Sequence, residues 1–328
     1  MDATAESFLR EQLFNRRQRL ETAIRVSIEP EGLVRLLQEV DSALKRMDAG
    51  TYGLCDLCHE PIEKDRMLAD PLVCYCLDHL TPGQKRALEQ DLELASYIQR
   101  ELLPKQGLTL AGWEVAYHYK PLGPVSGDYC DVTLRENGTK NLYFALGDAS
   151  GKGVAASMMM SHLHAIFRTL ISTGVPLPEL TERASRILCE SNLSTLFATF
   201  VCGKVDVSSE IELCNAGHCP VLVLRSGEVA RLAATGVPLG MFCSVQYSSQ
   251  RAYLEKGNSL FLYTDGLTEA RSISGEEYGE TRLMKLLEAS ASADSTSLIR
   301  ACTEDLTSFL AGAQLADDLT IMVIRRVG

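Results

Sequence analysis

Two groups of residues in this sequence have the types and spacing that metal chemistry requires. In the first group, Cys55 and Cys58 form a C-x2-C pair, and Cys76 and His79 repeat that spacing after seventeen intervening residues. Three thiolates and a neutral imidazole complete a tetrahedral zinc site and leave no open position, which favours a structural ion over a catalytic one. Cys74 is a competing ligand because C-x-C pairs also occur, but the repeated spacing favours Cys76. A set of buried free thiols is the alternative.

The second group consists of aspartates at four turn-like positions, next to small residues. Asp128, Asp148 and Asp265 stand in the segments SGD, GDASGKG and TDG, and Asp317 and Asp318 follow Ala316. Each position alone is an ordinary turn signal. Three of the four adjoin an apolar run typical of a β-strand, and carboxylates gathered at strand ends are ligands for hard divalent cations. Together they predict a shared metal site.

The two groups are expected to lie in parts of the chain with different secondary structure. Apolar residues at three-to-four spacing predict helices over 6–26 and 33–47, with a break near Pro30 that would allow a hairpin. A short heptad stripe follows over 82–103, formed by Leu88, Leu92, Ala95, Ile98 and Leu102.

From residue 113 the pattern changes to short β-rich runs that alternate with helices, which predicts an α+β domain. The expected strands include 113–119, 141–146, 199–205, 221–224, 259–263 and 320–324, and the expected helices are 154–172, 177–191, 281–289 and 295–310. The resulting organisation is a helical hairpin (1–49), a finger around the cysteines (50–81), a linker helix (82–104) and the α+β domain (105–328).

Composition excludes several classes of protein. The chain has 328 residues, of which 46% are hydrophobic and 23% charged, so it should fold, in about two domains. The net charge is −11 and neither part is basic, which argues against nonspecific binding of nucleic acid or anionic membranes. No run reaches about eighteen apolar residues and the start lacks a signal peptide, so we expect a cytoplasmic protein without a membrane segment.

The remaining cysteines and one histidine are expected to be structural. Seven cysteines lack pair spacing and are interpreted as small buried hydrophobic residues, namely Cys130, Cys189, Cys202, Cys214, Cys219, Cys243 and Cys302. His218, at a turn before a strand, is interpreted as a hydrogen-bonded structural residue rather than a general acid.

The cysteine segment resembles a known zinc finger. The residues AL-x-R-xxx-GTYG-x-C-xx-C (43–58) and RMLA-x-P (66–71) are similar to the DksA/TraR finger over about residues 40–80. Four cysteines usually hold the zinc in that family, and His79 stands where the last one would be. The hairpin is shorter than the coiled coil that DksA-type members insert into RNA polymerase. The resemblance therefore implies that the finger binds a regulatory partner, but it does not identify this partner as RNA polymerase.

The aspartate segments resemble the SpoIIE/RsbU branch of the PPM metal-dependent protein phosphatases over about residues 92–328. The similar stretches include SGDYCD (126–131), LGDASGKGVAASMMMS (146–161), LFLYTDGLTEAR (260–271) and ADDLTIMVIRR (316–326). The resemblance implies a PPM-type phosphatase β-sandwich flanked by helices. It also implies two Mn²⁺ or Mg²⁺ ions, both held by Asp148, with the Ala149 carbonyl as a further ligand, Asp128 on one ion, and Asp265 and Asp317 on the other. Asp131 and Asp318 would be structural or would support the ligands.

These resemblances imply a protein serine/threonine phosphatase that acts on a phosphorylated regulatory protein, an anti-sigma-factor antagonist, in bacterial partner switching. The stripe in the linker helix predicts a homodimer, because an isolated helix of this length is marginal unless its apolar side is covered. The alternative is a non-catalytic, transcription-associated binding protein with a degenerate phosphatase domain. The presence of every expected metal-binding aspartate argues against degeneracy.

Overall fold

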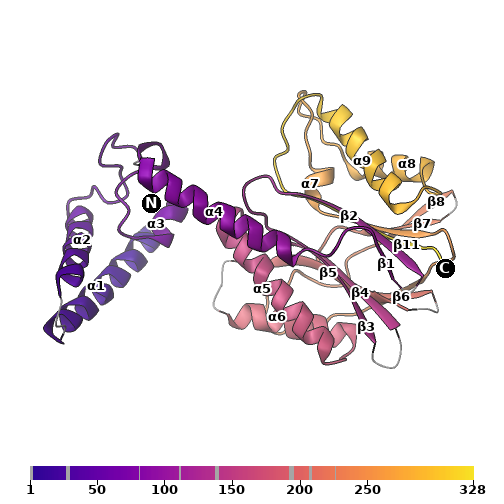
Figure 1. Ribbon diagram of the computed structural model, residues 1–328, viewed down its shortest axis with the longest axis horizontal. Coiled ribbons are helices and arrows are strands. Elements are labelled where there is room, and N and C mark those ends of the chain that lie inside the picture. Colours follow the sequence, from indigo (N-terminus) through magenta and orange to yellow (C-terminus); the bar gives the residue numbers. More distant parts are fainter. Residues whose placement is uncertain are drawn as a thin grey trace. The chain divides into compact units, whose positions relative to one another are not determined.

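The computed structural model describes residues 3–26, 30–80, 82–110, 112–136, 140–191, 196–206, 209–225 and 227–328. The chain divides into two compact units, residues 1–91 and 92–328 (Figure 1). The boundary lies within helix α4 (Pro82–Leu102), the helix that the sequence analysis assigns to a linker. Among the described helices, none combines the length and the apolar character needed to cross a membrane.

The first unit contains the expected helical hairpin and a small cysteine-rich segment. Helices α1 (Ala3–Val26) and α2 (Glu31–Asp48) are antiparallel, as the ion pairs Arg10–Asp48 (2.7 Å) and Arg17–Asp41 (3.0 Å) show. The cysteine segment adds α3 (Lys64–Ala69) and a 3-10 helix (Leu77–His79). One hydrophobic cluster joins the hairpin to this segment, and its largest fully buried members are Leu9, Leu13 and Met67.

The second unit is built on two antiparallel sheets. The six-stranded sheet has the order β1-β2-β11-β10-β7-β8, and the five-stranded sheet has the order β3-β4-β5-β6-β9. The strands are β1 (Leu108–Leu110), β2 (Trp113–Lys120), β3 (Asp128–Glu136), β4 (Lys140–Ala149), β5 (Ala198–Val205), β6 (Glu210–Ala216), β7 (Val221–Arg225), β8 (Glu228–Leu232), β9 (Gln250–Tyr253), β10 (Ser259–Tyr263) and β11 (Leu319–Arg326).

Helices cover the outer face of each sheet, which gives four layers. Helices α5 (Gly153–Ser172) and α6 (Leu177–Glu190) pack on the five-stranded sheet, and α8 (Glu280–Ala289) and α9 (Ser295–Leu310) pack on the six-stranded one (Figure 1). Alternate residues of each strand point to opposite faces, so one core lies between the sheets and one lies under each helix pair. This architecture confirms the expected α+β sandwich flanked by helices.

The observed elements agree with the expected ranges to within a few residues, and all four expected helices of the domain are present. The cysteine prediction is partly wrong. Cys130, Cys202, Cys214 and Cys302 are buried and unpaired as expected, and Cys219 is unpaired but only half-buried. Cys189 and Cys243 form a disulfide between the end of α6 and a later loop. Their separation of 54 residues follows no motif spacing, because the fold alone brings the two together.

Candidate active site and metal centre

Strand pairing brings the predicted aspartates to one end of the sandwich. Asp128 begins β3 and stands directly opposite Asp148 near the end of the neighbouring β4. Asp265 begins the short helix α7 (Asp265–Thr268) directly after β10, and Asp317 lies just before β11, the partner of β10. The two sheets therefore each present two of the four aspartates at adjacent strand ends.

The electrostatics of the site show that these carboxylates influence one another. Burial, and then the negative charges of Asp265, Asp317 and Asp318, raise the pKa of Asp148 to about 7. Burial also raises the pKa of Asp265, as do the charges of Glu269 and Asp317. A bound cation would stabilise carboxylates whose ionisation is opposed by burial and by neighbouring negative charges, so this group suits a cation site.

Asp128 is the most rigidly held of the four. Its side chain is buried, and its Oδ2 accepts hydrogen bonds from the hydroxyls of Thr264 (3.0 Å) and Thr320 (2.5 Å). Burial, and then the charge of Asp148, raise the pKa of Asp128 well above its usual value. Because Thr264 directly precedes Asp265 in the chain, the same contact fixes Asp128 and Asp265 relative to each other.

Asp318 holds the loop that leads into Asp128, in agreement with the supporting role expected for it. Its carboxylate accepts hydrogen bonds from the backbone amides of Leu122 (2.6 Å) and Gly127 (2.8 Å). Its backbone lies so close to Gly266 that a side chain there would overlap the carbonyl oxygen of Asp318. Glycine at 266 therefore allows the loops of Asp265 and Asp317 to meet.

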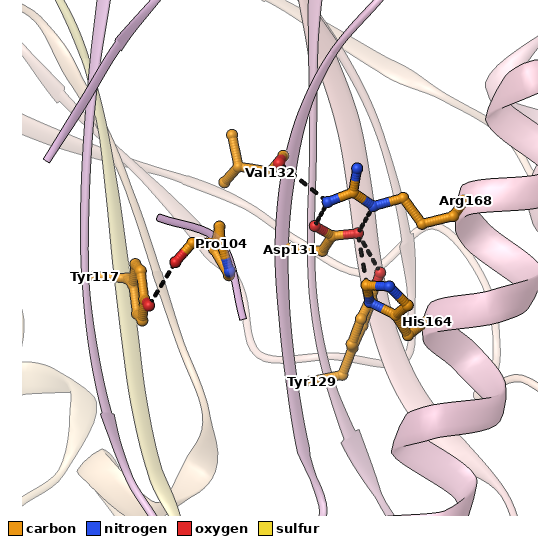
Figure 2. Close-up of polar contacts among 7 residues, drawn as sticks. All are labelled: Pro104, Tyr117, Tyr129, Asp131, Val132, His164 and Arg168. Atoms are coloured by element: carbon orange, nitrogen blue, oxygen red, sulfur yellow. Dashed lines mark hydrogen bonds and ion pairs between the residues drawn. The ribbon is translucent and has the colours of Figure 1, made fainter. Parts of the chain in front are cut away.

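Asp131 is also structural, and it joins β3 to α5 (Figure 2). Its carboxylate, fully buried, accepts two hydrogen bonds from the guanidinium of Arg168, at 2.6 and 2.5 Å, and one from the hydroxyl of Tyr129 at 2.9 Å. His164 Nδ1 lies 3.8 Å from the same carboxylate. A separate contact drawn in the same view is the hydrogen bond that the hydroxyl of Tyr117 donates to the carbonyl of Pro104, with a length of 2.7 Å (Figure 2). Since α5 begins five residues after Asp148, this buried ion pair stabilises the region that follows the site.

Two polar residues near the aspartates have defined partners. Lys152 Nζ lies 3.0 Å from Asp317 Oδ2 and donates to the Ala316 carbonyl at 2.6 Å. His218 is buried, its backbone amide donates to Asn215 Oδ1 at 2.8 Å, and its Nδ1 lies 2.7 Å from the Thr199 hydroxyl. Burial lowers the pKa of His218 to about 4, so the imidazole is neutral near pH 7. The contacts of Nδ1 and of the backbone amide favour the structural interpretation of His218, although its buried Nε2 has no hydrogen-bond partner among the described residues.

Gln99 of α4 contacts the site loop and was not among the expected residues. Only 3% of its surface is exposed, its Nε2 donates to the Ser126 carbonyl at 2.7 Å, and its Oε1 accepts from the Ser126 amide at 2.9 Å. Its Nε2 also lies 3.4 Å from the Ser157 hydroxyl on α5. The signal in the sequence was a glutamine four residues after Ala95 and three before Leu102, on the apolar side of a helix.

The structure brings Cys55, Cys58, Cys76 and His79 together. Their ligand atoms all lie within 4.8 Å of one another, and among the described residues no other group of three or more such side chains does. The four aspartates therefore share one end of the sandwich without meeting this distance. The sulfurs of Cys58 and Cys76 are 3.8 Å apart, and a tetrahedron with Zn–S bonds of about 2.3 Å has edges of about 3.8 Å. Cys74 is not in the group, because its thiol donates to the Leu72 carbonyl at 3.2 Å.

The charge state of the cysteines also suits a metal. Burial opposes ionisation of the Cys55 thiol, but hydrogen bonds from the backbone of Cys58, Cys76 and Leu57 outweigh it and lower the pKa of Cys55 to about 6. Burial raises the pKa of Cys74 and of Cys76 alike. Because metals bind thiolates, the lowered pKa of Cys55 suits a metal ligand, while the choice of Cys76 over Cys74 rests on their positions.

Comparison with known proteins identifies the class and then the family. The SiaA-PP2C domain of Pseudomonas aeruginosa superposes on 75% of this chain and 99% of its own, with a TM-score of 0.66 and 22% identity, so the second unit has the fold of a PP2C phosphatase domain. The model of the family described as Stage II sporulation protein E (SpoIIE) matches residues 138–327. The chain belongs to the SpoIIE family.

Two full-length relatives extend the match beyond the family model. Protein IcfG of Synechocystis sp. is 29% identical over 72% of this chain, and the phosphoserine phosphatase RsbU of Bacillus subtilis is 24% identical over 74% of it. The matched region spans 41% of the length of IcfG and 72% of the length of RsbU.

Proposed function

We propose that this protein is a metal-dependent protein serine/threonine phosphatase that dephosphorylates a regulatory protein in bacterial signalling. The observation that carries the proposal is the convergence of Asp128, Asp148, Asp265 and Asp317 at one end of a SpoIIE-family sandwich. The similarity to RsbU, a named phosphoserine phosphatase, supports the reaction class. The partner-switching substrate, of the anti-sigma-factor-antagonist type, is proposed from the resemblance of the sequence motifs to the SpoIIE/RsbU branch.

The donor set fits two Mn²⁺ or Mg²⁺ ions, because hard cations prefer carboxylate and carbonyl oxygens and would offset the burial and the repulsion that raise the pKa of Asp148. In this proposal Asp148 would hold both ions, with the Ala149 carbonyl as a further ligand. Asp128 would hold one ion, and Asp265 and Asp317 would hold the other. When bound, such a pair of ions activates water and neutralises charge on the phosphoryl group, so that hydrolysis requires no covalent enzyme intermediate.

The chain's own residues keep this donor set in place. Thr264 and Thr320 fix the Asp128 carboxylate by hydrogen bonds across the two sheets. Asp318 fixes the loop before Asp128, and Lys152 orients the Asp317 carboxylate. These contacts support the proposal because they restrict the movement of the proposed ligands, which lowers the reorganisation that metal binding would require.

Hydrolysis of p-nitrophenyl phosphate, followed by hydrolysis of phosphoserine and phosphothreonine peptides, tests the proposal. Turnover should depend on added Mn²⁺ or Mg²⁺ and stop with EDTA. An Asp265→Ala variant should retain phosphorylated substrate in a pull-down, because it weakens metal binding more than recognition. Absence of metal-dependent turnover on the ester and on every phosphopeptide would overturn the enzyme assignment, and capture of RNA polymerase subunits alone would favour a transcription-associated role.

The cysteine cluster belongs to the same proposal as a structural zinc site of the DksA/TraR type, with Cys55, Cys58, Cys76 and His79 as ligands. The match between the sulfur spacing and a zinc tetrahedron supports it. A regulatory partner of the finger would then bind a surface that depends on zinc for its fold.

A homodimer through α4 completes the proposal. The predicted stripe is only partly the exposed face of this helix, because Leu92 and Ala95 are half-buried and Leu102 packs against the domain core. The exposed apolar residues include Leu94 (58%), Tyr97 (59%) and Ile98 (52%), which share one face at three-to-four spacing. Sedimentation should give twice the chain mass, and a Leu94→Glu, Ile98→Glu double variant should give the single mass. A monomeric wild type would contradict this part of the proposal.

A further inference from the structure

A cavity of about 810 Å³ lies in the first unit, among α1, α2, the cysteine segment and the first turns of α4. It is separate from the aspartate site, since every lining residue precedes residue 91. Its polar wall contains four arginines from three helices, namely Arg16, Arg35, Arg46 and Arg66. Two of the described lining residues, Glu39 and Asp70, carry carboxylates.

This cluster of arginines contrasts with the acidic composition of the chain as a whole. The net charge is −11, and acidic residues outnumber basic ones in the first part of the sequence as well as in the second. The two lining carboxylates are already engaged. Asp70 Oδ1 accepts a hydrogen bond from the Leu72 amide at 3.0 Å, and Glu39 pairs with Arg35 at 3.7 Å on the same helix. Within the described lining, cationic side chains outnumber anionic ones four to two, while Asp56 and Glu63 pair with Arg46 (3.7 Å) and Arg66 (3.5 Å) from outside it.

Arg46 shows the clearest need for an additional partner. Its side chain is 14% exposed, and its Nε and Nη1 atoms are buried without a hydrogen-bond partner in the described structure. The carboxylate of Asp56 lies 3.7 Å from Nη1, which is an ion pair but not a hydrogen bond. Because these two atoms are covered by protein, a ligand in the cavity would contact the remainder of the Arg46 guanidinium, which also lies 6.0 Å from the centroid of the Tyr52 ring.

The other walls fix the size and character of the ligand. Arg66 is held in place because its Nη1 donates to the Tyr75 carbonyl at 2.8 Å. Nonpolar side chains complete the lining, among them Leu36, Leu80 and Leu88. The volume lies within the range of about 300–1,000 Å³ that is typical of small-molecule sites. A free phosphate would leave most of this space and most of the guanidinium donors unused.

We propose that this cavity binds a nucleotide-sized small molecule that carries at least two phosphate groups. Guanidinium groups form paired hydrogen bonds with phosphate oxygens, and four of them on three helices provide more donors than one phosphate can accept. The phosphates contact the arginines and the remainder of the ligand lies against the nonpolar wall. Binding would thus link a metabolite level to the hairpin and finger, which goes beyond the phosphatase reaction and does not depend on it.

The test is binding of inorganic pyrophosphate, ATP and GTP to the full-length, zinc-loaded chain by titration calorimetry. Mn²⁺ and Mg²⁺ are omitted, so that the acidic site of the second unit repels these anions. Orthophosphate and citrate serve as comparison anions. We expect one site per chain for pyrophosphate or a nucleotide, with affinity at least tenfold greater than for orthophosphate or citrate.

Variants on the same helices then locate the site. Arg46→Gln should weaken binding at least tenfold, and an Arg16→Gln, Arg35→Gln double variant should weaken it several-fold. Arg16 and Arg35 are exposed, so the double variant should fold even if Arg46→Gln does not. Arg19→Gln, an exposed position of α1 outside the cavity lining, should leave binding unchanged.

Three results would overturn the proposal. The first is no binding of pyrophosphate or either nucleotide at millimolar concentration. The second is binding that the double variant leaves unchanged. The third is binding of citrate or orthophosphate as tight as that of pyrophosphate, which would indicate a nonspecific anion site.

Discussion

The two candidate metal sites of this chain are assembled in opposite ways. The cysteine–histidine group of the first unit comes from one segment of 25 residues, Cys55 to His79, and two repeated spacings describe it. The aspartates of the second unit come from four segments, and the hydrogen bonds that hold Asp128 join residues 136 and 192 positions apart in the chain. A local site depends on its ligand atoms for its shape, whereas a dispersed site depends on the whole fold.

This difference predicts that metal removal affects the first unit most. Zinc binding by small fingers contributes about 10 kcal/mol or more, and a segment this short buries little apolar surface without the ion. We expect chelation to unfold residues 50–80 while the sandwich persists. Hydrogen exchange followed by mass spectrometry measures this directly. Protection of residues 50–80 that survives complete zinc removal would show that the finger does not depend on its ligand cluster.

The choice of ligands can be tested in the same way. Metal analysis should give about one zinc per chain, and this should fall to near zero in Cys76→Ser. Cys74→Ser is the matched control, because its thiol donates to the Leu72 carbonyl and should not bind the ion. Loss of zinc from Cys74→Ser with retention in Cys76→Ser would mean that the ligand assignment is wrong.

The dispersed site should respond in the opposite way, by losing activity without losing its fold. In Asp148→Asn one of the converging carboxylates is neutral, and a ligand shared by two ions is lost from both. We expect turnover to fall about a thousandfold or more, equivalent to about 4 kcal/mol, with an unchanged far-ultraviolet circular dichroism spectrum. Glu304→Gln, an exposed change on α9, is the control. Activity within about threefold of the wild type, with two ions still bound, would refute the shared role of Asp148.

The same contrast explains how much could be predicted from the sequence. Helices α5 and α9 and the cysteine group are set by local periodicity and spacing, so their positions followed directly from the pattern. Strand β3 was not among the expected strands, because the segment that contains Asp128 has small and polar residues typical of a turn. Its strand conformation results from pairing with β4, in which Asp128 stands opposite Asp148.

Contacts between distant segments could not be predicted for the same reason. Thr264 and Thr320 are ordinary strand-end residues in the sequence, and only the packing of the two sheets makes them partners of Asp128. The pairing of Cys189 with Cys243 likewise depends on where the loop after residue 239 returns to α6. The resemblance to the phosphatase family indicated which aspartates matter, but not which residues hold them.

Asp131 provides a test of how strongly the dispersed unit depends on one such contact. Asp131 is fully buried and accepts three hydrogen bonds, but its ion-pair partner Arg168 is 36% exposed, so removing the carboxylate should cost about 2 kcal/mol. Asp131→Ala should therefore lower the free energy of unfolding by about this amount in denaturant titration. The exposed pair Arg251–Glu210 is the control, and Arg251→Gln should cost about 1 kcal/mol or less. Equal losses in the free energy of unfolding for the two variants would show that the burial of Asp131 adds nothing to stability.

An effect of similar size, and the one that most sharpens the comparison, comes from Gln99. Gln99 lies in α4, but its side-chain amide forms hydrogen bonds with the backbone of Ser126, two positions before Asp128. Gln99→Ala leaves the buried Ser126 amide and carbonyl without these partners, at a cost of about 2 kcal/mol. Gln90→Ala, an exposed change on the same helix, should change stability by only a few tenths of a kcal/mol. Thermal unfolding of the two variants separates the loss of a buried contact from a change in helix propensity. If they melt together, α4 is not anchored through Gln99, and the site loop is then held by Asp318 and the sheet contacts alone.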